Sequence, residues 1–251
     1  AEFSLEGFRK GKVPSSIAEK HIPRDKVYTQ LIHTLLPRIY EEIIKKESLK
    51  PIVAPKVDLV KAKEKETWQI KATVAEKPTV ELGDYKKKIL EAKTNLKKDE
   101  IWVPGKEQTQ EKDDKTKNDK MLSVALTTLI KEIKCDVSSL IVETELNRKL
   151  TQLVDDVQKI GLTVDGYLQS KNLTMEKLKE QYSREIIEMY KLEFILLDIA
   201  DKEKIEVGQA ELDKLFGNLK TETEKATAMA NSYFYASVLR KQKTLDFLIS
   251  L

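Results

Sequence analysis

The residue types that most often carry catalysis are few in this sequence, and their spacing gives none of them a partner. His21 and His33 lie twelve residues apart, with no cysteine or further histidine near them, so they do not form the pattern of a zinc site. Cys135 is the single cysteine, which excludes an internal disulfide. Since no base lies close to it in sequence, we interpret Cys135 as a core thiol at a helix end rather than as a nucleophile.

Phosphate-binding and carboxylate chemistry are equally poorly supported. Three residues separate Gly7 from Gly11, where a P-loop needs four, and Val13 stands where a Ser or Thr would hold magnesium. The neighbouring aspartates 113–114 and 155–156 would point to different faces of a helix, so neither pair can act at one centre. The sequence therefore predicts no enzyme, and with it no cofactor, no metal and no small-molecule substrate.

The composition favours long helices with many charged residues. Of 251 residues, 40% are hydrophobic, 35% charged and only 6% aromatic, with 8 glycines and 7 prolines. A sheet sandwich would require more β-branched and aromatic residues and more turns. The longest apolar run, residues 194–200, is interrupted by Asp198 and falls short of the ~20 residues that cross a membrane. With no signal peptide visible, we expect a soluble, cytoplasmic protein without a membrane partner.

The first third of the chain predicts a helix and then a β-hairpin. Residues 25–47 place apolar side chains four residues apart, and Pro37 within them is expected to kink or divide the helix. The period then changes to two, which predicts a hairpin with one buried face, built from Val57, Leu59, Trp68, Ile70, Ala72 and Val74. A basic helix is expected over residues 84–98, followed by a polar linker over 99–120.

From Met121 onward the pattern is helical. Gly161 is placed to end one helix, and Thr163 and Thr174 are placed to begin the next two. Further helices are expected over residues 175–204, 209–216 and 223 to the end. The sequence thus predicts an α+β fold that is predominantly α, with a small helix-plus-hairpin module followed by an elongated all-helical domain with arms.

Charge is distributed unevenly between the two parts. Residues 1–98 carry 22 Lys and Arg against 14 Asp and Glu, whereas residues 99–251 carry 23 against 28. A basic front and an acidic back are typical of two modules with different partners, and the front could meet a polyanion. Ordinary solvated helix faces account for the same charges equally well.

One short motif is more specific. Gly7-Phe8-Arg9-Lys10-Gly11-Lys12-Val13-Pro14 resembles the signature loop of trigger factor, the bacterial ribosome-associated chaperone family. The resemblance continues at residues 77–82, which look like the exit from that family's ribosome-binding domain. It extends through residues 129–146, 162–168 and 194–207, which are similar to its C-terminal helical domain.

Two departures from the family accompany this resemblance. Only six residues precede the signature loop, where the family has strands and a long helix, so we expect an N-terminally incomplete ribosome-binding domain over residues 1–82. Residues 83–120 would be a linker helix and polar linker in place of the family's FKBP-type prolyl isomerase domain, and 121–251 the substrate-binding domain. A segment as short as 99–120 cannot build an isomerase pocket, so isomerase activity is expected to be absent.

The resemblance implies an ATP-independent chaperone that docks near the ribosomal exit tunnel and holds unfolded or nascent polypeptides. Docking would fall to the signature loop, through Gly7, Phe8, Arg9, Lys10, Gly11 and Lys12. Polypeptide contacts would come from flexible or amphipathic apolar side chains, for which the candidates are Met175, Tyr182, Met189, Tyr190, Met229, Tyr233 and Phe234. Each of these could instead fill the core, and a weak homodimer stays open.

Three other readings compete with this one. A helical scaffold or adaptor would bind one defined partner at a fixed stoichiometry. A nucleic-acid binder would use the basic front, although the aromatic pattern of common RNA-binding modules is missing. An exported chaperone resembling SurA would need a signal sequence, which is not visible.

Overall fold

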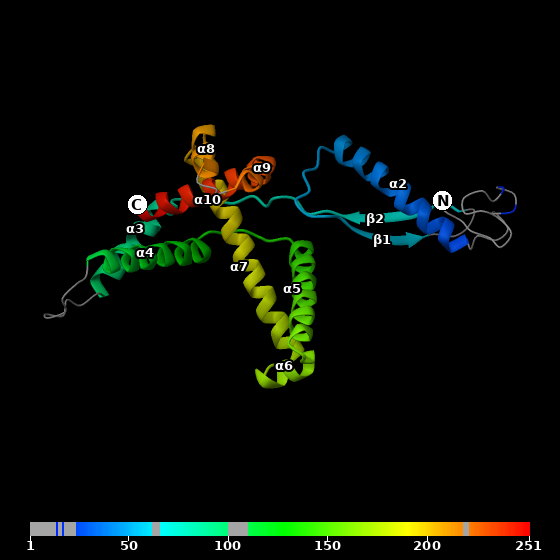
Figure 1. The fold of residues 1–251 in the computed structure, drawn as a ribbon, viewed down its shortest axis with the longest axis horizontal. Coiled ribbons are helices and arrows are strands. Elements are labelled where there is room, and N and C mark those ends of the chain that lie inside the picture. The colour runs from blue at the N-terminus through cyan, green and yellow to red at the C-terminus, as the bar shows by residue number, and fades with distance from the viewer. Residues whose placement is uncertain (1–13, 15–16, 18–23, 62–65, 100–109, 218–220) are drawn as a thin grey trace. The chain divides into compact units, whose positions relative to one another are not determined.

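A computed structural model describes residues 14, 17, 24–61, 66–99, 110–217 and 221–251 (Figure 1). The chain divides between residues 52 and 53 into two compact units. The prediction of an α+β fold that is mainly helical is confirmed, since one two-stranded sheet accompanies a large majority of helical residues within the described part.

The first unit contains the long helix α2, Arg24–Lys46. Pro37 lies within this helix and does not divide it, so division, one of the two predicted effects, does not occur. The apolar stripe expected from the four-residue spacing is present but stays largely in solvent, with Leu31, Leu35, Ile39 and Ile43 between 41% and 48% exposed. After Lys46 the backbone reverses at Ser48, whose φ is 54°, and the Leu49 N–H donates to Ile44 O at 3.1 Å.

The second unit begins with the predicted hairpin. Strand β1, Lys56–Lys61, pairs antiparallel with β2, Gln69–Thr73, and the register places Val57 opposite Ala72 and Leu59 opposite Ile70. The expected buried face is not formed, because Val57, Leu59 and Ile70 are 38%, 51% and 38% exposed. Period two thus identified the strands correctly but did not determine what covers them.

The helices of the second unit follow. They are α3 (Tyr85–Asp99), α4 (Gln110–Glu132), α5 (Ser139–Lys159), α6 (Val164–Ser170), α7 (Met175–Lys202), α8 (Gln209–Gly217), α9 (Glu222–Ala230) and α10 (Ser232–Ser250). Two bounds differ from the sequence expectation. Helix α4 begins eleven residues before Met121, because the polar stretch ahead of it contains neither Gly nor Pro to stop a helix. The last expected helix is two helices, separated at Asn231.

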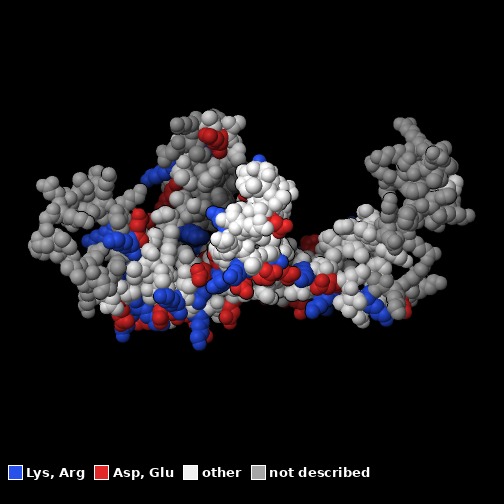
Figure 2. Space-filling model, turned by 90° about the horizontal axis from the view of Figure 1, so that it is seen from below, with Lys and Arg blue, Asp and Glu red and all other residues white. Residues whose placement is uncertain are grey.

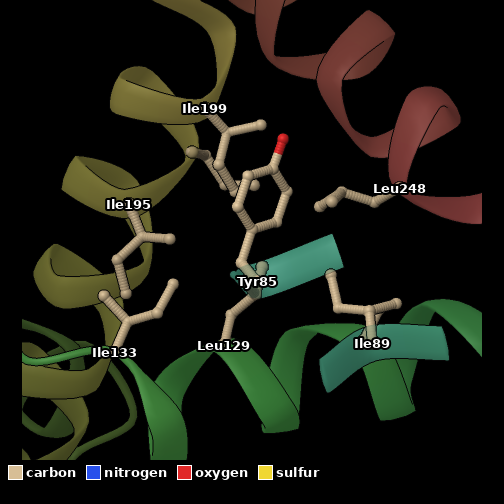
Figure 3. Close-up of a cluster of buried hydrophobic side chains, with 9 residues drawn as sticks. Tyr85, Ile89, Leu129, Ile133, Ile195, Ile199 and Leu248 are labelled. Carbon is tan, nitrogen blue, oxygen red and sulfur yellow. The ribbon is translucent and has the colours of Figure 1, made fainter. Parts of the chain in front are cut away.

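The main core forms where α3, α4, α7 and α10 meet (Figure 3). Tyr85 of α3 lies at its centre and is 2% exposed, surrounded by apolar side chains of the other three helices. The buried members are Tyr85, Ile89, Ala125, Leu129, Ile133, Ile195, Leu196, Ile199 and Leu248. Helix α3, expected from the sequence to be part of a linker, therefore contributes to the centre of the core.

Helices α5, α6 and α7 form a hairpin that extends from this core (Figure 1). The predicted caps are confirmed: the Thr163 hydroxyl accepts from Gly166 N–H at 3.1 Å and that of Thr174 from Lys177 N–H at 3.3 Å. Gly161 adopts a φ of 75°, a left-handed conformation that glycine reaches without the steric cost of a side chain, so α5 ends there as expected. These local signals fix where the hairpin turns.

The remaining helices pack as a small group of their own. Leu212 and Phe216 of α8 and Ala228 of α9 are buried together, with partly buried side chains of α10 against them. The rings of Phe216 and Tyr235 meet edge to face, with centroids 5.5 Å apart. Helix α9 begins with a capping box, in which Thr221 and Glu224 satisfy each other's backbone N–H groups. This group positions the first turns of α10.

Neighbouring residues of α3 provide a test of this core. Ile89 is fully buried and Leu90 is 46% exposed. Ile89→Ala should lower the free energy of unfolding by about 2–5 kcal/mol, because it leaves a cavity between four helices. Leu90→Ala removes a similar volume from the surface and should cost less than about 1 kcal/mol. Urea unfolding monitored by circular dichroism measures both, and equal losses would contradict the placement of α3.

Candidate functional site

A pocket of about 560 Å³ lies between the second half of α7 and the first half of α10. Its floor is tightly packed, with Leu196, Ala200 and Thr244 at most 3% exposed. Its upper walls remain in solvent: Tyr233 is 88% exposed, Phe234 61%, Val238 49% and Leu197 37%. We call this feature the α7–α10 groove. It is an apolar surface, open to solvent, on a well-packed base.

The turn after α7 closes one side of the groove. Two residues after α7, Lys204 adopts a left-handed conformation with a φ of 52°, and the Ile205 N–H donates back to Ala200 O at 2.9 Å. Glu206 and Val207 then line the groove. Helix α10 holds this turn, since Arg240 Nε donates to Ile205 O at 2.7 Å and Lys243 Nζ to Glu206 O at 2.8 Å.

Charges around the groove balance each other. Arg240 Nη2 lies 2.6 Å from Asp201 Oδ1, and Lys241 Nζ lies 3.8 Å from Glu193 Oε2. The bond from Arg240 is the main cause that lowers the pKa of Asp201 below its ordinary value, against the opposing effect of burial. A rim of paired charges keeps an apolar surface hydrated without favouring ligands of either sign.

The seven predicted polypeptide contacts do not form one site. Tyr233 and Phe234 both line the groove. Met189 of α7 and Met229 of α9 are 45% and 59% exposed, outside the groove lining. The other three are half-buried: Met175 at the start of α7, Tyr182 under Lys149 Nζ at 5.0 Å, and Tyr190 with its ring 6.0 Å from that of Phe194.

Sequence reasoning missed several groove residues. Val238 and Lys241 follow Phe234 by four and seven positions, so all three share one face of α10. The spacing alone does not identify Val238 and Lys241 as groove residues, because it does not show that no other helix covers this face of α10. Leu197 and Val207 gave no such signal, because their exposure depends on how α7 packs against α10.

The predicted ribosome-binding residues Gly7, Phe8, Arg9, Lys10, Gly11 and Lys12 lie outside the described residues. At the end of the motif, Pro14 O accepts a hydrogen bond from the Ile17 N–H at 3.0 Å, which forms a single turn of backbone. The role of the signature loop stays a prediction.

The basic front of the sequence is in part neutralised by the acidic back. Within the second unit, ion pairs join Lys56 to Glu143 at 2.7 Å, Lys86 to Glu203 at 2.7 Å and Lys88 to Glu132 at 2.9 Å. Lys77 pairs with Asp198 as well. Figure 2 shows positive and negative side chains close together in several places on the face in view. Some of the charge difference between the two parts of the sequence therefore serves contacts within the molecule.

Lys93 is a further member of the basic helix that faces inward. It is 6% exposed, and its Nζ donates to Leu248 O at 2.7 Å and to Ile249 O at 2.8 Å, near the C-terminal end of α10. Cations are favoured at this end of a helix, where carbonyl groups lack partners. Lys93 thus joins α3 to the end of α10.

Other site chemistries have no support in the described part of the chain. There, no three or more His, Cys, Asp or Glu side chains gather in a way that could bind a metal ion. Cys135 is buried, which is the main cause that raises the pKa of its thiol. Of the helices that the structure describes, none combines the length and the apolar character needed to cross a bilayer.

An exposed apolar groove with a balanced rim, on a helical body, is the kind of surface through which proteins bind other polypeptides. Comparison with known proteins identifies the family. Residues 1–103 match the model described as "Bacterial trigger factor protein (TF)", and residues 105–250 match "Bacterial trigger factor protein (TF) C-terminus". The chain therefore belongs to the bacterial trigger factor family. Since the two matches are separated only by residue 104, no isomerase domain lies between them.

Relatives at the sequence level include two trigger factors. That of Lactococcus lactis subsp. lactis strain IL1403 is 35% identical over 86 residues, which are 34% of this chain and 20% of the relative. That of Finegoldia magna is 42% identical over 87 residues, or 35% of this chain and 20% of the relative. The alignments thus span about a fifth of each relative's length.

The fold also matches a solved structure from work on "Promiscuous Substrate Recognition in Folding and Assembly Activities of the Trigger Factor Chaperone". The superposition covers 99% of this chain and 90% of the other, with a TM-score of 0.61 at 14% sequence identity. Identity this low supports the fold alone.

The contact between α3 and the end of α7 predicts a dependence of stability on pH. Glu203 accepts from Lys86 Nζ at 2.7 Å and from the Tyr85 hydroxyl at 2.8 Å, and these bonds lower the pKa of Glu203 below 4.5, with that of Lys86 as the larger cause. The stabilisation is therefore complete above about pH 4.5 and is lost as the pH falls through the lower pKa of the folded state.

Glu203→Gln should consequently unfold at lower urea than the unchanged protein at pH 7. The difference should shrink as the pH falls below about 4.5, because the folded state then progressively loses the stabilisation that the ionised carboxylate provides. Glu188→Gln, an exposed carboxylate on the same helix, is the control and should leave the urea midpoint unchanged. A difference for Glu203→Gln that is constant from pH 7 to pH 3 would contradict the ion pair.

Proposed function

We propose that this protein is an ATP-independent chaperone that docks at the ribosomal exit tunnel and holds unfolded nascent polypeptides in its helical domain. Family membership supports a chaperone role. The observation on which the proposal chiefly rests is the α7–α10 groove, where Tyr233, Phe234 and Val238 stay in solvent above a packed floor.

The properties of the groove suit a holding role. Tyr and Phe side chains bury a large apolar area and lose little conformational entropy on binding. Since Arg240 and Lys241 at the rim are paired with acidic side chains, the groove would select apolar content rather than net charge. Met189 and Met229 offer further contacts that adapt to different side chains. Several weak contacts along one client would add up to useful affinity.

Docking is assigned to the signature loop by its resemblance to the family motif. Arg9 can donate two parallel hydrogen bonds to a carboxylate or phosphate, Lys10 adds a positive charge and Phe8 an apolar anchor. Gly7 and Gly11 would shape the turn, with Lys12 as a further cation. Exposed charge pairs of this kind weaken with salt.

The proposal also covers location and catalysis. A chaperone at the exit tunnel works in the cytoplasm, on polypeptides rather than on small molecules. Without the isomerase domain, it would not accelerate prolyl isomerisation. The predicted boundaries at residues 82 and 120 are kept as a proposal, although α4 runs through residue 120 and α3 is part of the core.

Ribosome docking is tested by co-sedimentation at low salt. The double variant Arg9→Ala/Lys10→Ala should bind ribosomes at least about tenfold more weakly, because two charged contacts are lost at about 1 kcal/mol each. Lys45→Ala/Lys46→Ala removes the same charge from the end of α2 and should bind like the unchanged protein. Equal binding by all three proteins would remove the docking assignment.

Client holding is tested by suppression of the aggregation of a chemically denatured, unrelated protein. Tyr233→Asp/Val238→Asp places two charges in the groove and should raise the concentration needed for suppression at least about fivefold, since apolar burial is lost. The matched control Ile160→Asp/Leu162→Asp changes two other exposed apolar side chains, 68% and 47% exposed, just after the end of α5.

The matched variant should behave like the unchanged protein. Equal losses in both variants would show that the groove is not the client site. If the unchanged protein does not suppress aggregation but binds a single partner saturably at one to one, the protein is better described as a helical scaffold or adaptor.

A further inference from the structure

One wall of the α7–α10 groove depends on a side chain of α10 with two different partners. Arg240 Nε donates to Ile205 O at 2.7 Å, which holds the turn of residues 203–208 beside the groove. Its Nη2 donates to Asp201 Oδ1 at 2.6 Å. The same guanidinium therefore fixes both the end of α7 and the turn that follows it.

Asp201 is shared with a third segment. Its other oxygen, Oδ2, lies 3.7 Å from Lys77 Nζ, and Lys77 also pairs with Asp198, one helical turn earlier on α7. Lys77 belongs to residues 74–84, which connect the β-hairpin to α3. An ionic chain thus runs from the connecting segment through Asp201 to Arg240 and the groove wall.

The two oxygens of Asp201 give this chain two arrangements. Lys77 places a positive charge 3.7 Å from Oδ2, while Arg240 binds Oδ1 through Nη2 and keeps its Nε on Ile205 O. If Lys77 moves away, Oδ2 loses this charge and can be bound by Arg240 instead. A guanidinium prefers to bind a carboxylate through two parallel hydrogen bonds, and a pair formed by Nε and Nη2 would withdraw Nε from Ile205 O. The turn would then lose the bond that holds it against α10.

We propose that Lys77 is a positioning residue for the groove, acting through Asp201 and Arg240, so that displacement of residues 74–84 lowers the affinity of the groove for a client. This inference rests on the proposed function in taking the groove as the client site. It adds a mechanism by which displacement of the segment that follows the β-hairpin would change the affinity of the groove for a client. The ion pairs are partly exposed, so the expected effect is modest.

The test uses the full chain with Lys77→Met, and with Lys56→Met as control. Lys56 forms a comparable surface pair with Glu143, away from the groove. Amide hydrogen exchange of residues 203–208 should quicken about threefold in Lys77→Met and stay unchanged in Lys56→Met. Lys77→Arg keeps the charge and should restore slow exchange. Unchanged exchange in Lys77→Met overturns the proposal whether or not a client binds.

Affinity for a labelled, unfolded peptide rich in Phe, Leu and Val supplies the second readout. Lys77→Met and Arg240→Met should each weaken binding about threefold, and the double variant should be no weaker than Arg240→Met alone. If the losses of affinity in the two single variants multiply in the double variant, Lys77 acts independently of Arg240. That result would overturn the proposal. If the unchanged protein binds no peptide, the proposed function fails while the exchange experiment still decides the relay.

Discussion

Helix α3 packs between α4, α7 and α10, and this packing forms the main core of the second unit. Tyr85 and Ile89 place two of the most buried side chains of the molecule at the meeting point of these helices (Figure 3). Tyr85 also donates to Glu203, and Lys93 reaches the last carbonyls of α10. Because α3 directly follows residues 74–84, the hairpin is joined to the helical body through a core element. Helix α3, which the sequence analysis assigned to a linker, thus supplies central side chains of the core.

Ion pairs add to the packing between the first part of the chain and the helices that follow it. Lysines of the basic front meet carboxylates of α4, α5 and α7, and these pairs are mostly exposed on at least one side. Exposed pairs add about 0–1 kcal/mol each, so apolar burial supplies most of the stability and the pairs mainly fix orientation. The same reasoning applies at the groove, where Arg240 and Lys243 orient the turn after α7. A net charge computed from sequence segments gives no sign of such pairing.

Local signals in the sequence predicted the local structure well. Thr163, Thr174 and Gly161 act as caps because the hydrogen bonds and backbone angles involved need only neighbouring residues. The break at Asn231 was missed, since the residues on both sides of it favour a helix. The buried face of the hairpin was wrongly predicted because alternation reports strand geometry and not what packs on the strand.

The groove was found only in part from the sequence. Tyr233 and Phe234 were chosen for their residue type, whereas Leu197, Val207 and Val238 belong to it through the packing of α7 against α10. Lys93 escaped notice because a lysine in a basic helix is expected in solvent, and only the position of the α10 carbonyls explains its burial. Long-range packing of this kind has no counterpart in residue spacing.

In the proposed function, nascent polypeptides would occupy the α7–α10 groove while the protein is at the ribosome. Photo-crosslinking from a reactive side chain placed at position 233 tests it most directly, with the same side chain at position 160 for comparison, on ribosomes that carry a stalled apolar nascent chain. We expect strong crosslinks to the nascent chain from position 233 and few from position 160. Equal yields from both positions, or none from 233, would contradict it.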